Sequence, residues 1–203
     1  MTRIHYSAPV QTVPPTVEPL SVADARAHSR ITQTAEDPLI ESYIKAARIY
    51  AEGVLNQQLI TATWRWKFSA FPGEIIVPKM PYQENDPVTT TIAYLDSGGD
   101  SQDLTEDTHF RVAADAWPAV IYPEYLVEWP ATYDDKESVT LTWKAGYGDE
   151  ATDIPETILQ ALRLAVALQI EFREPIVIGA GVNAIPLNTV DTLLGLHGTV
   201  HVY

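Results

Sequence analysis

The sequence predicts an α+β fold with an N-terminal helical pair, a central antiparallel β portion, a long apolar C-terminal helix and extended termini. Two stretches, 37–56 and 155–173, carry apolar residues at helical spacing. Over 61–147 the period changes to two residues, which is typical of strands with one buried side. A block of strands between helical segments favours α+β over the alternating order of an α/β protein.

The composition is that of a folded protein with an acidic surface. The 203 residues are 46% apolar and 20% charged, with a formal net charge of -14 and no cysteine. The lack of cysteine excludes disulfides, thiolate nucleophiles and cysteine-ligated metal centres. The charge opposes tight binding to nucleic acid, because each phosphate contact normally needs a Lys or Arg. No signal peptide or membrane-spanning stretch is found, so we expect neither export nor membrane insertion.

Residues 1–19 are expected to form an extended arm, either free or laid across a partner. Their prolines restrict the backbone to extended conformations, and they stand at Pro9, Pro14, Pro15 and Pro19. A short helix is then predicted from Ser21 to about Arg30. The Ser21 hydroxyl can cap its first turn, and Asp24 follows three residues later in a pattern close to a capping box.

The clearest helix spans about 37–56, with Pro38 in its first turn, where a missing N–H costs nothing. Its apolar residues share one broad arc that we expect in the core: Leu39, Ile40, Tyr43, Ile44, Ala47, Tyr50, Ala51, Val54 and Leu55. The other side carries a charged stripe predicted to face solvent, made of Glu41, Lys45, Arg48 and Glu52. Ile49 lies on this polar side and is a candidate for a subunit contact.

The middle of the chain, 61–147, predicts five or six antiparallel strands. Aromatic and basic residues alternate along 64–68, and "YLDSGGDSQDL" has the glycines of a tight hairpin. Tryptophan in strands is usually core or subunit interface, although it can also stack on single-stranded nucleic acid where basic residues lie beside it. Core or interface is therefore the favoured interpretation for Trp64, Trp66, Trp117, Trp129 and Trp143.

The last long helix is predicted over about 155–173, with Asp153 as its cap and Glu156 three residues later. Apolar residues cover more than half of its circumference, so we expect neighbours on more than one side. A tail over 175–203 carries a short helix around 188–194. The predicted organisation is thus an arm at 1–19, one domain at 20–174 and the tail.

The stretch "TWKAGYGDEATDIPETI", 142–158, raises the question of a phosphate-binding loop. It lacks the third glycine of a dinucleotide fingerprint and the G-K-[ST] of a P-loop, and its carboxylates would repel a phosphate. Asp149, Glu150 and Asp153 are oxygen ligands at close spacing, but the residue order of a calcium-binding EF-hand is absent. The sequence therefore predicts a structural turn that depends on Gly146, Gly148 and Pro155.

Histidines do not form a readable catalytic or metal site. His197 and His201 are four residues apart, but no Glu stands between them and Gly198 argues against a helix. There is no G-x-S-x-G serine and no cysteine for a histidine to activate. Two other hypotheses stay open: an enzyme that uses the acidic loop and His109 with a small ligand or a metal ion, and a nucleic-acid-binding module that uses its tryptophans.

Several motifs follow one another in a specific order. They are "PLSVADARAHSRI", "EDPLIESYIKAARIYAEGVLNQQLI", "TWRWKFSAFPGEIIVPKMP", "IAYLDSGGD", "HFRV", "WPAVIYP" and "VTLTWKAGYGDEATDIPETILQALRLAVALQIEFRE". With these motifs the chain resembles, over roughly 19–196, the head-to-tail connector (adaptor) proteins of long-tailed bacteriophages and gene transfer particles. The longer proline-rich arm and the ending "GTVHVY" depart from the commoner pattern of that family.

The resemblance implies a structural virion protein without catalysis, cofactor or metal. Such proteins form a twelve-subunit ring that docks on the portal protein at the capsid vertex and receives stopper or tail completion proteins, while DNA passes through without specific binding. The expected location is the head-tail junction, after synthesis in the cytoplasm of the host bacterium. The apolar positions expected at oligomer or portal contacts are Ile49, Leu164, Leu168, Phe172, Ile176, Ile178, Leu193, Leu194 and Tyr203.

Overall fold

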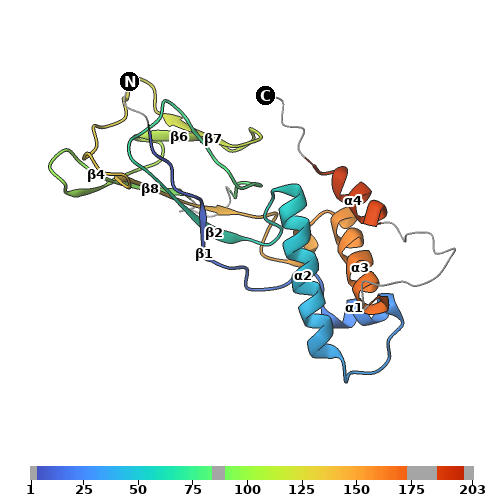
Figure 1. Cartoon of the computed structure of the whole chain (residues 1–203). Helices are drawn as coiled ribbons and strands as arrows, with labels where there is room; N and C mark the ends of the chain where they lie inside the picture. The colour runs from blue at the N-terminus through green and yellow to red at the C-terminus, as the bar shows by residue number, and fades with distance from the viewer. Residues whose placement is uncertain (1–3, 84–89, 173–186, 199–203) are drawn as a thin grey trace. The chain divides into compact units, whose positions relative to one another are not determined.

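The computed structural model describes residues 4–83, 90–172 and 187–198, and they form two compact units (Figure 1). The described residues of the first unit are 4–15 and 61–147, and they form the β portion. Those of the second unit are 16–60, 148–172 and 187–198, and they form the helices. The stretch predicted as one domain, 20–174, is thus divided between two units. The α+β class is confirmed.

The β unit contains two antiparallel sheets. The larger sheet has the order β1-β2-β8-β4-β5, and the smaller has the order β3-β7-β6. The described part of 61–147 holds seven strands where five or six were predicted, because the two residues of β3 are too few to show a period. The strands are β1 Val10–Val13, β2 Ala62–Phe68, β3 Ile75–Ile76, β4 Thr90–Leu95, β5 Ser101–Leu104, β6 Phe110–Ala113, β7 Val120–Pro123 and β8 Val139–Ala145.

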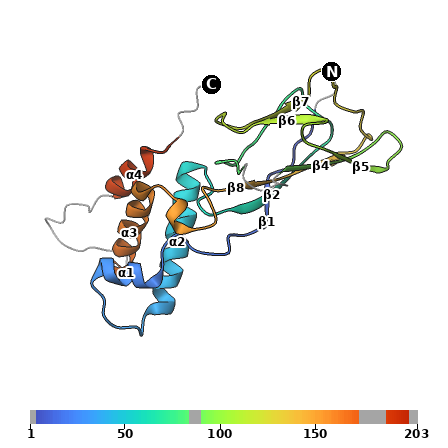
Figure 2. The same ribbon diagram turned by 180° about the vertical axis from the view of Figure 1, so that it is seen from behind.

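The core of this unit lies between the two sheets. Strands β2 and β8 pair with Trp64 opposite Trp143 and Phe68 opposite Val139, so that alternate side chains of both strands face the same way. Trp143 is fully buried there, while Trp64, Trp66 and Trp129 pack against the core from its margin. Figure 2 shows β6 and β7 as a layer apart from β4, β5 and β8. Their contribution to the core is Ile121 and Phe110, both with no exposed surface.

The N-terminal arm is extended, as predicted, but it lies on its own chain. Strand β1 pairs antiparallel with β2 and forms an edge of the larger sheet. Tyr6 stacks on Trp66 with ring centroids 5.3 Å apart, and the Ser7 carbonyl accepts a hydrogen bond of 2.8 Å from the Trp66 indole. The expectation of a free or partner-bound arm is therefore corrected, because β2 offers the backbone groups that an extended segment can pair with.

The described helical unit consists of α1 Val22–Ser29, α2 Asp37–Leu55, the 3-10 turn η1 Ala151–Asp153, α3 Glu156–Glu171 and α4 Leu187–Gly195. Ser21 caps α1 as predicted, since its hydroxyl oxygen accepts from the Asp24 N–H at 3.0 Å. Helix α2 ends at Leu55 and is capped by Asn56, whose left-handed backbone, with a φ of 52°, closes the last turn. Helix α3 contacts α1, α2 and α4, and it buries Ile158 and Leu162 completely or nearly so.

The start of α3 differs from the prediction. Pro155 is its N-cap residue, and no side chain caps it. Asp153 instead belongs to η1, where its carboxylate accepts a hydrogen bond of 3.0 Å from the Glu150 N–H. Asp153 is therefore corrected from a helix cap to a turn-forming residue. No helix among the described residues combines the length and the apolar character needed to cross a bilayer.

Arg48 also differs from the prediction, because it is buried rather than solvated. Only 7% of its surface is exposed. Its guanidinium donates to the Glu18 carboxylate at 2.7 and 3.2 Å and to the Glu52 carboxylate at 2.9 Å. The i,i+4 pair of Arg48 with Glu52 is thus confirmed, but Glu18 is 30 residues away in the sequence and gives no periodic signal.

The other oxygen of Glu52 holds the segment that follows α2. It accepts hydrogen bonds from the Gln58 side chain at 2.6 Å and from the Leu59 N–H at 3.1 Å. Burial opposes the charge of Arg48, but the hydrogen bonds and charges of Glu18 and Glu52 outweigh it and raise the Arg48 pKa. Burial raises the pKa of Glu52. Arg48 and Glu52 together join three segments of the helical unit.

We expect Arg48→Met to lower the free energy of unfolding by about 3–5 kcal/mol, because it leaves two carboxylates without their buried partner. Arg163→Met is the matched control, since Arg163 pairs with Glu156, whose side chain is 74% exposed. That change should cost at most about 1 kcal/mol. Urea denaturation followed by far-UV circular dichroism measures both values. Equal losses in the two variants would contradict the role assigned to Arg48.

The raised pKa of Glu52 predicts a pH dependence of stability. The folded chain holds a proton on Glu52 at pH values where the unfolded chain has lost it, so this group stabilises the fold most below its ordinary pKa. Its contribution falls as the pH rises through the window above that value. Denaturation of the wild type and of Glu52→Gln between about pH 4 and pH 6 should show a shrinking stability advantage of the wild type. A growing advantage would mean that the Glu52 pKa is lowered.

Candidate functional site

The glycine-rich stretch after β8 is a compact turn. Gly146 has a φ of 146°, its N–H donates to the Pro81 carbonyl at 2.9 Å, and its carbonyl accepts from the Gln83 side chain at 2.9 Å. Gly148 is needed for a different reason, since a Cβ atom there would overlap the Asp153 side chain. A positive φ favours glycine at the first position, and a close approach requires it at the second.

The acidic residues of this turn are engaged with the backbone. Glu150 and Asp153 form a reciprocal capping box across η1. Among the described residues, no group of three or more His, Asp or Glu side chains is placed to hold a metal ion. His109 accepts a hydrogen bond of 3.0 Å from the Thr105 N–H through its Nδ1. The side chains of Glu150, Asp153 and His109 are thus each engaged by the backbone of their own turn.

The other candidate histidines and tryptophans whose side chains the structure describes do not form a binding site either. His197 follows α4 and contacts the Thr157 hydroxyl through its ring, while His201 lies outside the described residues. Trp117 is 46% exposed, but Trp143 is buried and Trp64 stacks on it with centroids 6.5 Å apart. The tryptophans therefore do not line up as a stacking platform.

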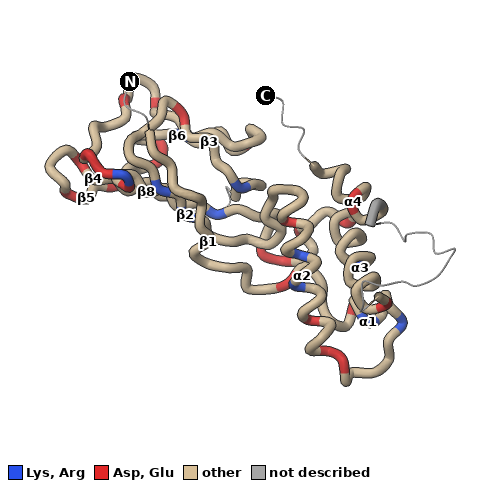
Figure 3. The backbone as a smooth tube through the Cα atoms, viewed as in Figure 1, with Lys and Arg blue, Asp and Glu red and all other residues tan. Residues whose placement is uncertain are grey.

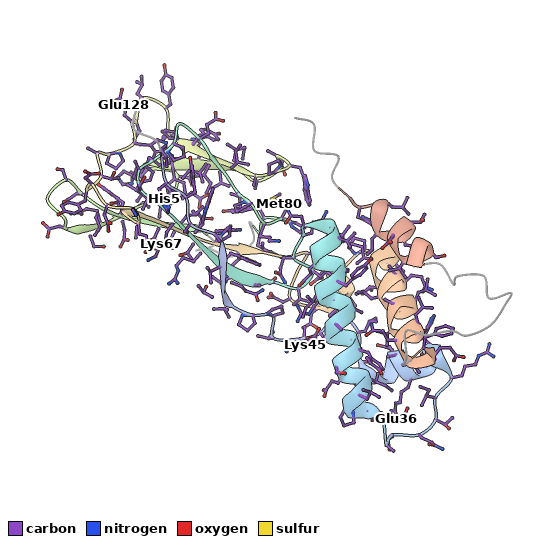
Figure 4. All side chains as sticks on the ribbon, viewed as in Figure 1. His5, Glu36, Lys45, Lys67, Met80 and Glu128 are labelled. Atoms are coloured by element: carbon purple, nitrogen blue, oxygen red, sulfur yellow. The ribbon has the colours of Figure 1, made fainter. Side chains whose placement is uncertain are left out.

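Helix α2 carries a long uncharged surface. We call it the α2 stripe and define it by the exposed residues Leu39, Ser42, Ala46, Ile49, Tyr50, Gly53 and Val54. At 100° per residue these positions fall within one arc, and they follow the helix over roughly 22 Å. Ile49 and Val54 are 55% and 50% exposed. The charged residue Lys45, labelled in Figure 4, lies outside the stripe.

The sequence predicts only part of the α2 stripe as a contact surface. Ile49 was singled out, but Leu39, Tyr50 and Val54 were assigned to the core arc, and all three are exposed. The width of the apolar arc could have revealed this surface, because the arc is wider than the face of α2 that one set of neighbours buries. The buried face consists of Ile40, Ile44, Ala47, Ala51 and Leu55. Tyr50 is also held by a hydrogen bond of 2.6 Å from its hydroxyl to the Asp191 carboxylate of α4.

The remaining predicted contact positions have different environments. Leu194 has no exposed surface, so it is a core residue and its assignment to a contact is corrected. Leu164, Leu168 and Leu193 are half-buried, and Phe172 is 38% exposed at the end of α3. Ile176, Ile178 and Tyr203 lie outside the described residues.

Acidic residues outnumber basic residues by about two to one. The chain has 27 Asp and Glu residues against 13 Lys and Arg residues, and both units carry acidic positions (Figure 3). Close contact between two such surfaces is opposed by repulsion. An uncharged stripe is therefore the part of this surface best suited to contact another acidic molecule.

Comparison with known proteins identifies relatives of the chain. Residues 19–94 match the family model described as "Phage gp6-like head-tail connector protein". This match confirms the resemblance to head-tail connector proteins. The comparison with curated protein sequences gave no match.

Solved structures resemble the chain over almost its whole length. A chain in the neck of an empty gene transfer agent particle, computed with C6 symmetry, aligns with a TM-score of 0.76 at 22% identity, covering 97% of this chain and 98% of that one. A chain in the virion of a native gene transfer agent particle has a TM-score of 0.76 at 21% identity, covering 97% and 98%. A chain in the neck of the native particle, computed with C12 symmetry, has a TM-score of 0.69 at 24% identity, covering 97% and 96%. These likenesses establish the fold.

We expect Gly148→Ala to destabilise the chain by about 1–3 kcal/mol, because the added Cβ displaces the Asp153 side chain from the Glu150 N–H. Gly73→Ala is the control, since no atom lies within 4 Å of a Cβ at that position. That change should stay within about 0.5 kcal/mol of the wild type. Thermal or urea denaturation measures both, and an unchanged stability of Gly148→Ala would show that the turn relaxes without cost.

Proposed function

Because residues 19–94 match the phage gp6-like head-tail connector family, we propose that the chain is a structural virion protein that connects head and tail. The observation that carries the proposal is the fold likeness to neck proteins of gene transfer agent particles, which covers 97% of the chain. It extends beyond the family match to the later strands of the β unit, β5 to β8, and to α3. The chain then acts by assembly and carries out no catalysis.

The assembly is a ring at the head-tail junction. The C12 symmetry of one related neck supports twelve subunits. The ring docks on the portal protein at the capsid vertex and receives a stopper or tail completion protein on its other side. A net charge of -14 per subunit suits a DNA channel, because a wall with few Lys and Arg residues makes few phosphate contacts and lets DNA slide.

The α2 stripe is the subunit contact that this ring requires. Twelve acidic chains repel one another, and a contact that buries uncharged surface does not add to this repulsion. The stripe combines apolar Ile49 and Val54 with the small residues Ser42, Ala46 and Gly53, which let a neighbouring backbone approach closely. A head-to-tail contact of this kind closes into a ring when its rotation divides a full turn.

The proposal is tested by co-expressing the chain with the portal protein of the same particle and imaging the purified complex by electron microscopy. The expected result is a ring of this chain on one end of the portal. A chain that stays monomeric and does not bind the portal would overturn the proposal.

For the subunit contact, we expect the double variant Ala46→Glu and Gly53→Glu to lose the ring while keeping the wild-type Tm. Both positions are exposed, so the added carboxylates leave the isolated fold intact and place charge in the contact. Lys45→Glu is the matched control, because it changes the net charge by -2 at a position outside the stripe. The double variant changes the net charge by the same amount, since each of its two substitutions adds one negative charge. The control should assemble. Normal rings of the double variant would exclude the α2 stripe as the contact.

A further inference from the structure

A four-residue turn after β7 displays two large apolar side chains to solvent. The turn runs from Glu124 to Val127 and is closed by a hydrogen bond of 2.9 Å from the Val127 N–H to the Glu124 carbonyl. Its two central residues, Tyr125 and Leu126, are 83% and 88% exposed. They are the most exposed of the large hydrophobic residues in the described part of the chain.

The backbone of this turn is costly for the residue that occupies it. Leu126 has a φ of 63°, at the third position of the turn, where a positive φ normally selects glycine or asparagine. A branched, bulky residue in this conformation is an outlier. The Leu126 side chain packs against little of the protein, because it is almost fully exposed. Neither backbone conformation nor core packing accounts for a leucine here, and such strain is commonly found where a surface serves a function.

The base of the turn is held rigidly. The Glu124 N–H donates to the His109 carbonyl at 3.1 Å, and the Glu124 carboxylate accepts from the Tyr125 N–H at 2.9 Å. The same carboxylate forms an ion pair with Arg111 on β6. The Tyr125 N–H and Arg111 together lower the pKa of Glu124, so it is ionised at neutral pH. A rigid base reduces the entropy lost when the two apolar side chains enter a partner.

A small acidic hollow lies directly beside the turn. It has a volume of about 250 Å³, and its lining includes Val127, the last residue of the turn, with Asp103, Glu128, Tyr94 and Trp129. Both carboxylate residues are exposed, and Figure 4 labels Glu128 on the loop beyond β7. Two carboxylates beside two aromatic rings form an environment that favours a Lys or Arg side chain.

We propose that Tyr125 and Leu126 are an anchor that inserts into an apolar pocket of a different protein of the particle, and that a Lys or Arg beside that pocket enters the hollow. Tyr and Arg are enriched in binding hot spots, which form where a large side chain fills a well-packed pocket of the partner. A second copy of this chain is a poor occupant, because it presents a net charge of -14 to an acidic surface. An anionic membrane is disfavoured by the same carboxylates. The inference rests on the proposed function, since the ring brings the chain to its partners.

The test uses assembled rings of the full chain with the purified portal and the purified stopper protein of the same particle, each titrated by surface-based binding. We expect Leu126→Gly to weaken binding to one of them by roughly tenfold or more. The same variant should keep or raise the Tm, because glycine adopts the positive φ without strain. A purely structural role of Leu126 would instead lower the Tm.

Two further variants separate the anchor from the hollow. Glu128→Lys should weaken the same binding and reduce its dependence on salt, because it removes the attraction for a basic side chain. Tyr133→Ser is the control, since Tyr133 is an aromatic residue 47% exposed on the same unit, and it should bind as the wild type does.

The outcomes distinguish this inference from the proposed function. Rings that form and bind both proteins equally well with Leu126→Gly overturn the anchor but leave the connector function standing. Loss of the ring itself in this variant would show that a second copy occupies the turn, which also overturns the inference. Binding of wild-type rings to phosphatidylcholine vesicles that is lost in Leu126→Gly would assign the turn to lipid. Failure of the wild type to form any ring would count against the proposed function.

Discussion

The buried ion pairs of Arg48 are the interaction on which the helical unit depends. One guanidinium holds Glu18, from the segment that leads into α1, and Glu52, one turn further along α2. Through its second oxygen Glu52 also fixes the backbone at Leu59, where the chain leaves this unit. Buried charges are costly unless each is paired, so these partners are required together. Their arrangement sets where the chain enters and leaves the helical unit.

The acidic charge of the chain constrains how it can associate. With 27 acidic and 13 basic residues, an arbitrary contact between copies meets repulsion. The structure separates two kinds of uncharged surface. The α2 stripe is long and includes the small residues Ser42, Ala46 and Gly53, which suits the proposed contact between equal subunits. The turn at Tyr125 and Leu126 is small, protruding and bordered by carboxylates, which suits a basic partner.

Both units are assembled from segments far apart in the sequence. The edge strand β1 precedes the helices but pairs with β2, which follows them. In the helical unit, α1 and α2 precede the β portion and pack against α3, which follows it. The two units are therefore tied to each other by chain connectivity, and neither folds from one continuous stretch. This explains why boundaries read from composition, at 19 and 174, do not coincide with the units.

The sequence alone determined the α+β class, the bounds of α1 and α2 to within a residue, the β4–β5 hairpin and the turn glycines, because these follow from local period, capping and backbone freedom. The sequence also showed the family resemblance, because the order of motifs along a chain can be recognised without knowledge of the structure. The tertiary structure decided the burial of Arg48, the placement of the arm in its own sheet and the exposure of three of the nine apolar arc residues of α2. Each depends on a partner distant in the sequence, such as Glu18 or β2, and local pattern holds no information about which distant segment fills a given surface.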